Sequence, residues 1–182
     1  MRTILIAFTA FAALALPGVA NADLPIGAKA PAFKASAALA GKDFTFDLRT
    51  ALRKGPVVLY FYPKAFTQGC TLEAHAFAEA APQFAKHGAS VVGMSADDLP
   101  TLRKFSTEAC RDKFAVGVAT PSLIEAYDVA LKRPGMASEM TDRTSYVIAP
   151  DGRIAFVHSD LDYRDHVRLT LEAVKALKSG KR

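Results

Sequence analysis

The side chain with the most reactive chemistry in this sequence is Cys70, one of only two cysteines. It follows a β-branched and aromatic run, Val57–Tyr62 (VVLYFY), and helix-forming residues begin at Thr71. This pattern predicts that Cys70 lies in the first turn of a helix that follows a buried strand. Unpaired N–H groups and the positive end of the helix dipole stabilise a thiolate there, and the thiolate is the nucleophilic form of cysteine. The alternative is a small buried apolar residue without a chemical role.

Two residues upstream extend this candidate site, in the arrangement Pro63-x-x-x-Thr67-x-x-Cys70. The Thr67 hydroxyl lies three residues before the thiol, where it could bond the sulfur or cap the helix. Pro63 has no N–H and a fixed φ, so it can shape and shield the connecting loop.

The elements around this site alternate between strands and helices. Expected strands cover 57–62, 90–95, 116–119, 145–149 and 154–158, the last two joined by a Pro-Asp-Gly turn, after weaker strand patterning within 32–46. Expected helices cover 71–86, 99–113, 121–127 and 165–178, with one helical turn within 47–54. Pro82 implies a kink or a fresh start within the first of these helices. The pattern predicts a three-layer α/β domain with a mixed central sheet flanked by helices.

The first 22 residues are typical of an export signal. Arg2 is followed by an apolar run of thirteen residues, Ile4–Leu16, and then by Pro17-Gly18. Ala20–Ala22 has the small-x-small pattern of a cleavage site, which predicts cleavage before Asp23. The run is short for a membrane anchor. We therefore expect one mature domain, 23–182, in the periplasm or secreted, with no stable membrane association after cleavage.

Charge and histidine spacing argue against several other functions. The chain has 23 basic and 18 acidic residues, and loss of Arg2 leaves a net charge of +4. The basic residues are scattered apart from the C-terminal tail, so no nucleic-acid partner is expected. The four histidines lack metal-ligand spacing with one another or with the cysteines, so no metal is expected.

Pro63, Thr67 and Cys70 match the active-site signature of the peroxiredoxins, thiol peroxidases with a thioredoxin-like fold. The wider stretch 57–74 (VVLYFYPKAFTQGCTLEA) resembles the subgroup named after bacterioferritin comigratory protein, also called the Q type. The resemblance continues in GAKAPAF (27–33), VVGMSADD (91–98) and RTSYVIAPDGRI (143–154).

The resemblance implies a set of site residues. Cys70 would attack the peroxide, Thr67 and Pro63 would line its pocket, and Arg143 would stabilise the charge on the departing oxygen. Otherwise Arg143 is an ordinary surface charge at a strand edge. Glu73 also matches the subgroup, but it could equally be an acid that complements the helix dipole, so we leave it outside the catalytic set. No metal, haem or flavin cofactor is implied.

The sequence departs from the subgroup at the residue that would resolve the oxidised cysteine. Many members have a cysteine five residues after the first, where this chain has His75, for which we expect no acid–base role. Cys110 lies in the expected helix 99–113 and is the possible resolving thiol. Three fates of a Cys70 sulfenate stay open: condensation with Cys110 after partial unfolding, attack by an external thiol, or pairing of Cys110 between subunits. A buried, inert Cys110 is a further alternative.

The function we expect is reduction of hydrogen peroxide and small organic hydroperoxides, with reduction of the enzyme by a thioredoxin-like or other dithiol. A monomer or a homodimer is compatible with the sequence. One alternative is a thiol–disulfide exchange protein, although a C-x-x-C motif is missing around Cys70. Another is a non-catalytic exported domain with a permanent Cys70–Cys110 disulfide.

Overall fold

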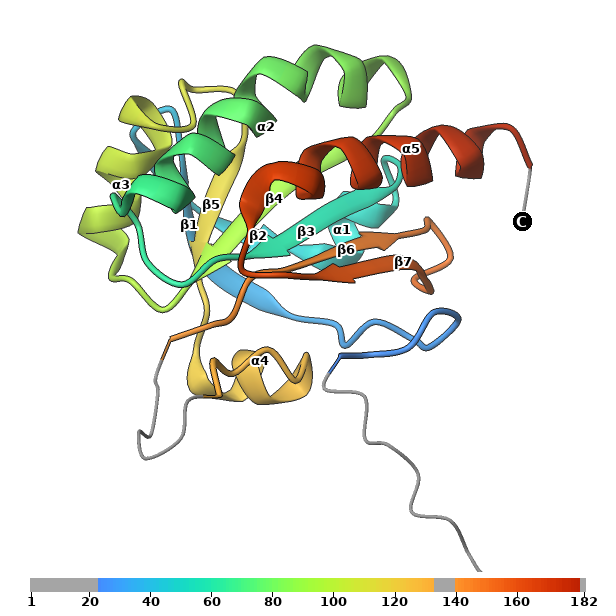
Figure 1. Cartoon of the computed structure of the whole chain (residues 1–182), viewed down its shortest axis with the longest axis horizontal. Helices are drawn as coiled ribbons and strands as arrows, with labels where there is room; N and C mark the ends of the chain where they lie inside the picture. Colours follow the sequence, from blue (N-terminus) through green and yellow to red (C-terminus); the bar gives the residue numbers. More distant parts are fainter. Residues whose placement is uncertain (1–22, 133–139, 181–182) are drawn as a thin grey trace, which may run out of the picture.

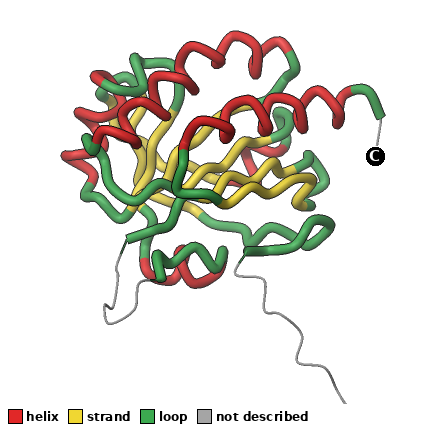
Figure 2. The backbone as a smooth tube through the Cα atoms, viewed as in Figure 1, coloured by secondary structure: helices red, strands yellow, loops and turns green. Residues whose placement is uncertain are grey.

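A computed structural model describes residues 23–132 and 140–180 (Figures 1 and 2). The predicted export segment and most of the predicted loop 132–142 lie outside these residues. Within the described part of the chain, no helix is long and apolar enough to cross a membrane.

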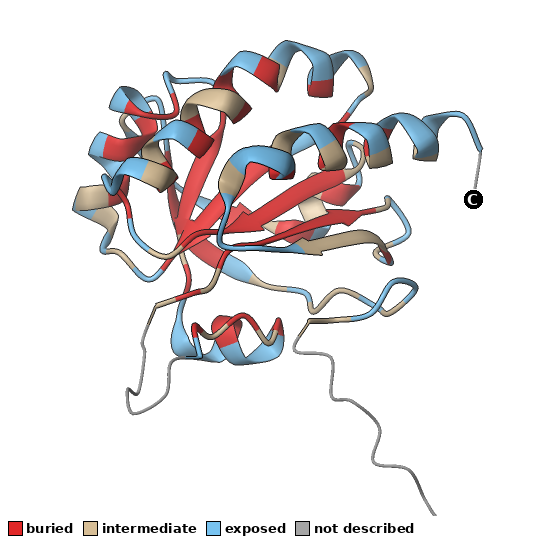
Figure 3. Cartoon of the chain, viewed as in Figure 1, coloured by how far each residue is buried: buried red, intermediate tan, exposed pale blue. Residues whose placement is uncertain are grey.

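Seven strands form one mixed sheet in the order β2-β1-β5-β4-β3-β6-β7. The strands are β1 (Lys34–Leu39), β2 (Lys42–Asp47), β3 (Val57–Phe61), β4 (Ser90–Ser95), β5 (Ala115–Val118), β6 (Thr144–Ile148) and β7 (Ile154–Ser159). Strands β3, β4 and β5 are parallel, and the remaining neighbours pair antiparallel. The central strands are buried on both faces, which is why their sequences are continuous apolar runs (Figure 3).

Helices cover both faces of the sheet. They are α1 (Leu48–Leu52), α2 (Gln68–Lys86), α3 (Leu99–Glu108), α4 (Pro121–Ala126) and α5 (His166–Lys178), with a 3₁₀ turn, η1 (Tyr163–Asp165), before α5. Val58 and Tyr60 of β3 pack with α2, α3 and α5, whereas the alternate residues Val57, Leu59 and Phe61 pack with α1 and α4. The predicted three-layer α/β class with a mixed sheet is confirmed.

Of the two effects expected from Pro82, a fresh helix start is excluded, because α2 continues through this residue. The predicted end of the next helix is wrong. Helix α3 ends at Glu108 instead of near Lys113, which places Cys110 in the turn after the helix. The chain turns there because Arg111 and Asp112 both have left-handed backbones, with φ of 50° and 60°.

The lack of a side chain at Gly93 of β4 leaves room for the ring of Tyr60 on the neighbouring strand β3. A Cβ atom at this position would lie 2.7 Å from Cζ of Tyr60, which is 1% exposed. We expect Gly93→Ala to lower the free energy of unfolding by about 1–3 kcal/mol, because the buried ring has no room to move. Urea unfolding measures this. Gly152→Ala is not a suitable control because its φ is positive, so Ala96→Gly in the exposed loop after β4 serves instead. An unchanged unfolding midpoint for Gly93→Ala would contradict the close packing.

Candidate active site

Cys70 is the third residue of α2 and lies at the carboxyl end of the parallel strands, as the sequence predicted. The loop between β3 and α2 is fixed by β4 and the residues after it. Tyr62 N–H donates to the Met94 carbonyl at 3.0 Å, and Ala65 N–H donates to Oδ2 of Asp97 at 2.7 Å. The Cys70 side chain is 2% exposed. The loop therefore delivers the thiol to the amino terminus of a long helix in a largely water-excluded position.

The structure brings Pro63, Thr67 and Cys70 to the same end of α2. Thr67 is the N-cap residue, but its side chain makes no capping hydrogen bond. Its hydroxyl donates instead to the Lys64 carbonyl at 2.9 Å. Thr67 is exposed and Pro63 is half-buried. The side-chain cap that we considered for Thr67 is therefore wrong, and the hydroxyl has free lone pairs toward solvent.

Arg143 comes directly before β6 and places its guanidinium beside the thiol. Its Nη2 lies 3.4 Å from Sγ of Cys70, and its Nε donates to the Leu161 carbonyl at 2.9 Å. Arg143 is 5% exposed, so the alternative of an ordinary surface charge is wrong. The hydrogen bond from Nε to the Leu161 carbonyl therefore holds the guanidinium with Nη2 toward the sulfur.

Glu73 fixes the rest of this guanidinium. Its Oε2 accepts a hydrogen bond from Nη1 of Arg143, and the carboxyl group is fully buried. Burial raises the pKa of Glu73, and the Arg143 guanidinium beside it opposes that shift and favours the carboxylate. Glu73 is one helical turn after Cys70, on the same face of α2. Its part in the ion pair was missed by the sequence analysis, although this three-residue spacing was the available signal.

His166, at the start of α5, lies on the far side of the same carboxyl group. Its Nδ1 is 3.8 Å from Oε1 of Glu73, an oxygen with no hydrogen-bond partner among the described residues. The ring is fixed by the Ser145 hydroxyl at 2.8 Å and by the Asp160 carbonyl, which is 2.9 Å from Nε2. A proton on Nε2 directed to that carbonyl leaves Nδ1 as an acceptor for the hydroxyl. Burial lowers the pKa of His166 to about 4. No pattern in the sequence pointed to this contact.

We expect His166 to make the stability of the fold sensitive to acid. The pKa of its ring is lower in the folded protein than the ordinary histidine value of 6.5, so the unfolded chain binds more protons between pH 6.5 and 4. Stability is therefore full above pH 6.5 and falls by about 3 kcal/mol as the pH approaches 4. Urea unfolding of the wild type and of His166→Asn across this range isolates the effect, because other titrating groups are common to both. If the free energy of unfolding fell with pH equally in wild type and in His166→Asn, the assigned role of His166 would be contradicted.

Cys110 is fully buried and belongs to the same core cluster as Cys70. Both cysteines are free in this structure. Burial raises the pKa of the Cys110 thiol above its ordinary value. His75 is half-buried on α2, on a different face from Glu73. The described residues contain no group of three or more histidine, cysteine or acidic side chains arranged to hold a metal ion.

Comparison with known proteins places this site in a family. The sequence profile of the AhpC/TSA family matches residues 26–157, which include the β3–α2 junction and Arg143. The chain belongs to the AhpC/TSA family.

Several proteins that are similar in sequence or structure to this chain are named peroxiredoxins or peroxidoxins. The AhpC/TSA chain is 31% identical over 121 residues to peroxiredoxin Bcp of Bacillus subtilis, covering 65% of this chain and 77% of that protein. It is 29% identical over 146 residues to peroxiredoxin Bcp of Xanthomonas campestris, covering 72% of this chain and 91% of that protein. Peroxidoxin BcpB of Mycobacterium tuberculosis has a similar structure, with a TM-score of 0.74 at 30% identity over 84% of this chain and 97% of that one. The predicted thioredoxin-like peroxiredoxin fold and the resemblance to the bacterioferritin comigratory subgroup are confirmed.

Proposed function

We propose that this protein is a thiol-dependent peroxidase in which Cys70 reduces hydrogen peroxide and small organic hydroperoxides. The observation that carries the proposal is the guanidinium of Arg143 held 3.4 Å from the Cys70 sulfur at the amino terminus of α2. The cation and the helix N–H groups place positive charge where negative charge develops when a thiolate attacks a peroxide. The peroxiredoxin relatives described above support the same chemistry.

The reaction transfers one oxygen atom. The Cys70 thiolate attacks one oxygen of the O–O bond, the bond breaks, and the other oxygen leaves with its electron pair and takes a proton. Water leaves from hydrogen peroxide and an alcohol from an organic hydroperoxide, and Cys70 is oxidised to the sulfenic acid. A dithiol then reduces the sulfenic acid, directly or through a disulfide, with release of water.

Each site residue has a separate task in this scheme. Arg143 stabilises the negative charge that develops on the departing oxygen. The Thr67 hydroxyl oxygen accepts a hydrogen bond from the entering peroxide while the hydroxyl donates its own hydrogen bond to the Lys64 carbonyl. Pro63 supplies a wall without a competing N–H. Glu73 does not touch the substrate and is a positioning residue that holds Arg143 in place.

The rim of the site favours organic hydroperoxides in addition to hydrogen peroxide. Three large apolar side chains are exposed close to it in the chain: Phe66, beside Thr67; Leu72, in the first turns of α2; and Leu161, whose carbonyl holds Arg143. Apolar surface at the entrance can accept the carbon chain of an alkyl peroxide. Alkyl peroxide reduction is described for the bacterioferritin comigratory protein of Xanthomonas campestris, whose structure has a TM-score of 0.70 at 27% identity over 80% of this chain.

Cys110 is the proposed resolving thiol. Both cysteines are buried and free in this structure, and in this proposal the disulfide forms after local unfolding of the two segments that carry them. Left-handed residues border both segments, with a φ of 62° at Phe66 and of 50° at Arg111. Such conformations cost about 1–3 kcal/mol each, which reduces the free energy needed for local unfolding.

Consumption of hydrogen peroxide by the reduced protein tests the proposal. We expect wild type to consume peroxide catalytically with dithiothreitol, Cys70→Ser to consume none above the reductant alone, and Cys110→Ser to retain the first turnover. Catalysis by Cys70→Ser equal to that of wild type would refute the assignment. If Cys110→Ser also keeps its steady-state rate with a protein dithiol, the external thiol resolves the sulfenate and Cys110 is idle.

The proposal also covers where the protein acts and which molecule reduces it. The signal-like residues 1–22 and the cleavage pattern before Asp23 support a periplasmic or secreted protein. A thioredoxin-like dithiol is the proposed reductant, and a monomer or a homodimer the proposed assembly. Mass analysis of the protein recovered after export gives the cleavage point and the mass of the assembly.

A further inference from the structure

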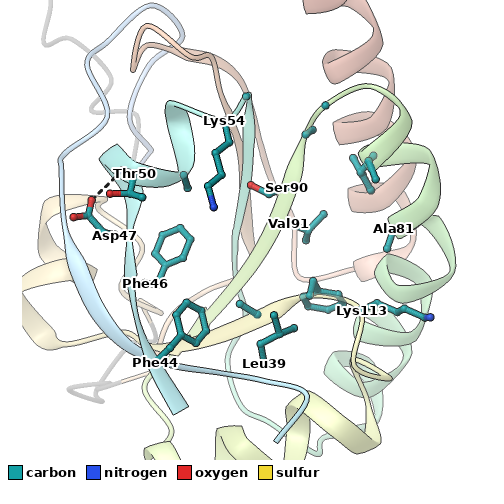
Figure 4. Close-up of a pocket in the computed structure, with 18 of the residues that line it drawn as sticks. Leu39, Phe44, Phe46, Asp47, Thr50, Lys54, Ala81, Ser90, Val91 and Lys113 are labelled. Carbon is teal, nitrogen blue, oxygen red and sulfur yellow. Dashed lines mark hydrogen bonds between the residues drawn. The ribbon is translucent and has the colours of Figure 1, made fainter. Parts of the chain in front are cut away.

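A cavity lies between β2, β4, β5 and the end of α2, away from the candidate active site (Figure 4). It has a volume of about 870 Å³ and lies at the amino ends of the parallel strands, where Ser90 begins β4 and Ala115 begins β5. Helix α2 contributes its last turns to the wall. Since Ala81 is eleven residues after Cys70 in this helix, the two sites are about 16 Å apart along its axis. The cavity is therefore separate from the candidate active site.

The walls of the cavity are mainly apolar. They include Leu39, Phe44, Phe46, Phe84, Val91 and Phe114. Leu39 and Phe44 are 38% and 41% exposed, which makes them two of the six exposed large apolar side chains in the described residues. A cavity of this size with apolar walls is typical of small-molecule sites, and a ligand would remove these side chains from water.

Most of the charged side chains that line the cavity are positive. Lys34, Lys54 and Lys113 line it, and Asp47 is the one acidic residue that does. Asp47 is already occupied, because it pairs with Lys34 at 3.4 Å and caps α1 by accepting from Thr50 N–H at 3.1 Å. Neither of the other two lysines forms an ion pair within 23–132 and 140–180.

Lys54 is the cation that faces the interior of the cavity. Figure 4 shows its side chain extending into the space beside Phe46, with the Ser90 hydroxyl directed toward the same space. Lys113 extends away from it at the far side. An ammonium group and a hydroxyl above apolar walls match a molecule with an anionic head and an apolar chain.

We propose that this cavity binds a free fatty acid, with the carboxylate on Lys54 and Ser90 and the aliphatic chain along the phenylalanine-lined wall. An aliphatic ammonium ion would meet uncompensated positive charge, and a fatty alcohol would leave Lys54 without a counter-ion. The site therefore favours an anionic head group, and the carboxylate of a fatty acid is the one that we assign to it. The assignment does not depend on the peroxidase proposal.

Binding of decanoate to the full mature chain, followed by ¹H–¹⁵N NMR below the micellar concentration, tests this. We expect saturable shifts at Gly55, Gly88 and Ser90, with no saturable shift at Gly69 beside Cys70. Lys54→Met should raise the Kd about tenfold, since it removes a charge-assisted hydrogen bond. Ala85→Trp, at an exposed position of the wall, should weaken binding by narrowing the cavity. Lys42→Met, on β2 but outside the cavity, is the matched control and should leave the Kd unchanged.

Other outcomes would overturn the assignment. They are shifts that do not saturate, a Kd that neither Lys54→Met nor Ala85→Trp changes, or decanol binding as tightly as decanoate. A stable dimer whose interface shifts fall on the same residues, and which decanoate does not dissociate, would assign the cavity to a second copy of the chain instead. Spectra of each variant without ligand verify its fold, so a lost interaction is not confused with unfolding.

Discussion

Replacement of Arg143 by methionine is expected to slow the reaction of Cys70 with hydrogen peroxide by about 10²–10³-fold, measured by stopped flow on the reduced protein. The guanidinium lies 3.4 Å from the sulfur, where it can stabilise both the thiolate and the departing oxygen. Arg143→Lys should recover only part of the rate, because an ammonium group cannot bond Glu73, Leu161 and the reacting atoms at once.

A control must separate the effect of Arg143 on the rate of reaction with peroxide from its effect on the stability of the fold. Arg143→Met leaves the Glu73 carboxyl group buried without its partner, so the variant is also less stable. A double variant, Arg143→Met with Glu73→Gln, removes the unpaired charge and should regain stability but not rate. Arg168→Met, which removes an exposed arginine of α5, should react like wild type. If the double variant regains the wild-type rate, Arg143 acts on stability alone and its catalytic assignment is wrong.

Replacement of Glu73 by alanine is expected to lower the free energy of unfolding by about 3–5 kcal/mol. The loss arises because the Arg143 guanidinium stays buried while its carboxylate partner is removed. Glu73→Gln should cost less, since the amide oxygen can still accept a hydrogen bond from the guanidinium. Urea unfolding at pH 7 measures both variants.

Glu79→Ala is the matched control for Glu73→Ala. Glu79 is a glutamate of the same helix whose side chain is 70% exposed, and it pairs with Arg111 at the surface. Its loss should leave the unfolding midpoint nearly unchanged, because exposed ion pairs add little to stability. Equal midpoints for Glu73→Ala and Glu79→Ala would show that the buried pair does not hold the helix to β6. An accompanying fall in the peroxide rate is expected for Glu73→Ala alone, because Arg143 then keeps only its hydrogen bond to the Leu161 carbonyl.

The sequence predicted the site as far as local patterning reaches. The run Val57–Tyr62, the helix formers after Cys70 and the Pro63-to-Cys70 spacing describe a junction that the chain forms locally. Arg143 is 73 residues further along, and only the family resemblance connected it with Cys70 before the structure placed β6 beside β3. His166 and its contact with Glu73 depend on how α5 packs against α2, which sequence spacing does not encode.

The turn at Cys110 was mispredicted for a related reason. Apolar residues continue past Glu108 at helical spacing, so the pattern favoured a longer helix. The helix ends earlier because Phe114 must return the chain to the core before β5 begins at Ala115. The left-handed residues Arg111 and Asp112 make that reversal. Without a glycine or an asparagine there, the sequence carries little turn signal.

Intact-mass analysis of the reduced Cys110→Ser variant, within seconds of adding one equivalent of hydrogen peroxide, tests the central claim most directly. The account predicts a gain of one oxygen atom located on the Cys70 peptide, reversed by a dithiol. An unchanged mass, or an oxygen found on a methionine instead, would contradict the assignment of Cys70 as the residue that reduces peroxides.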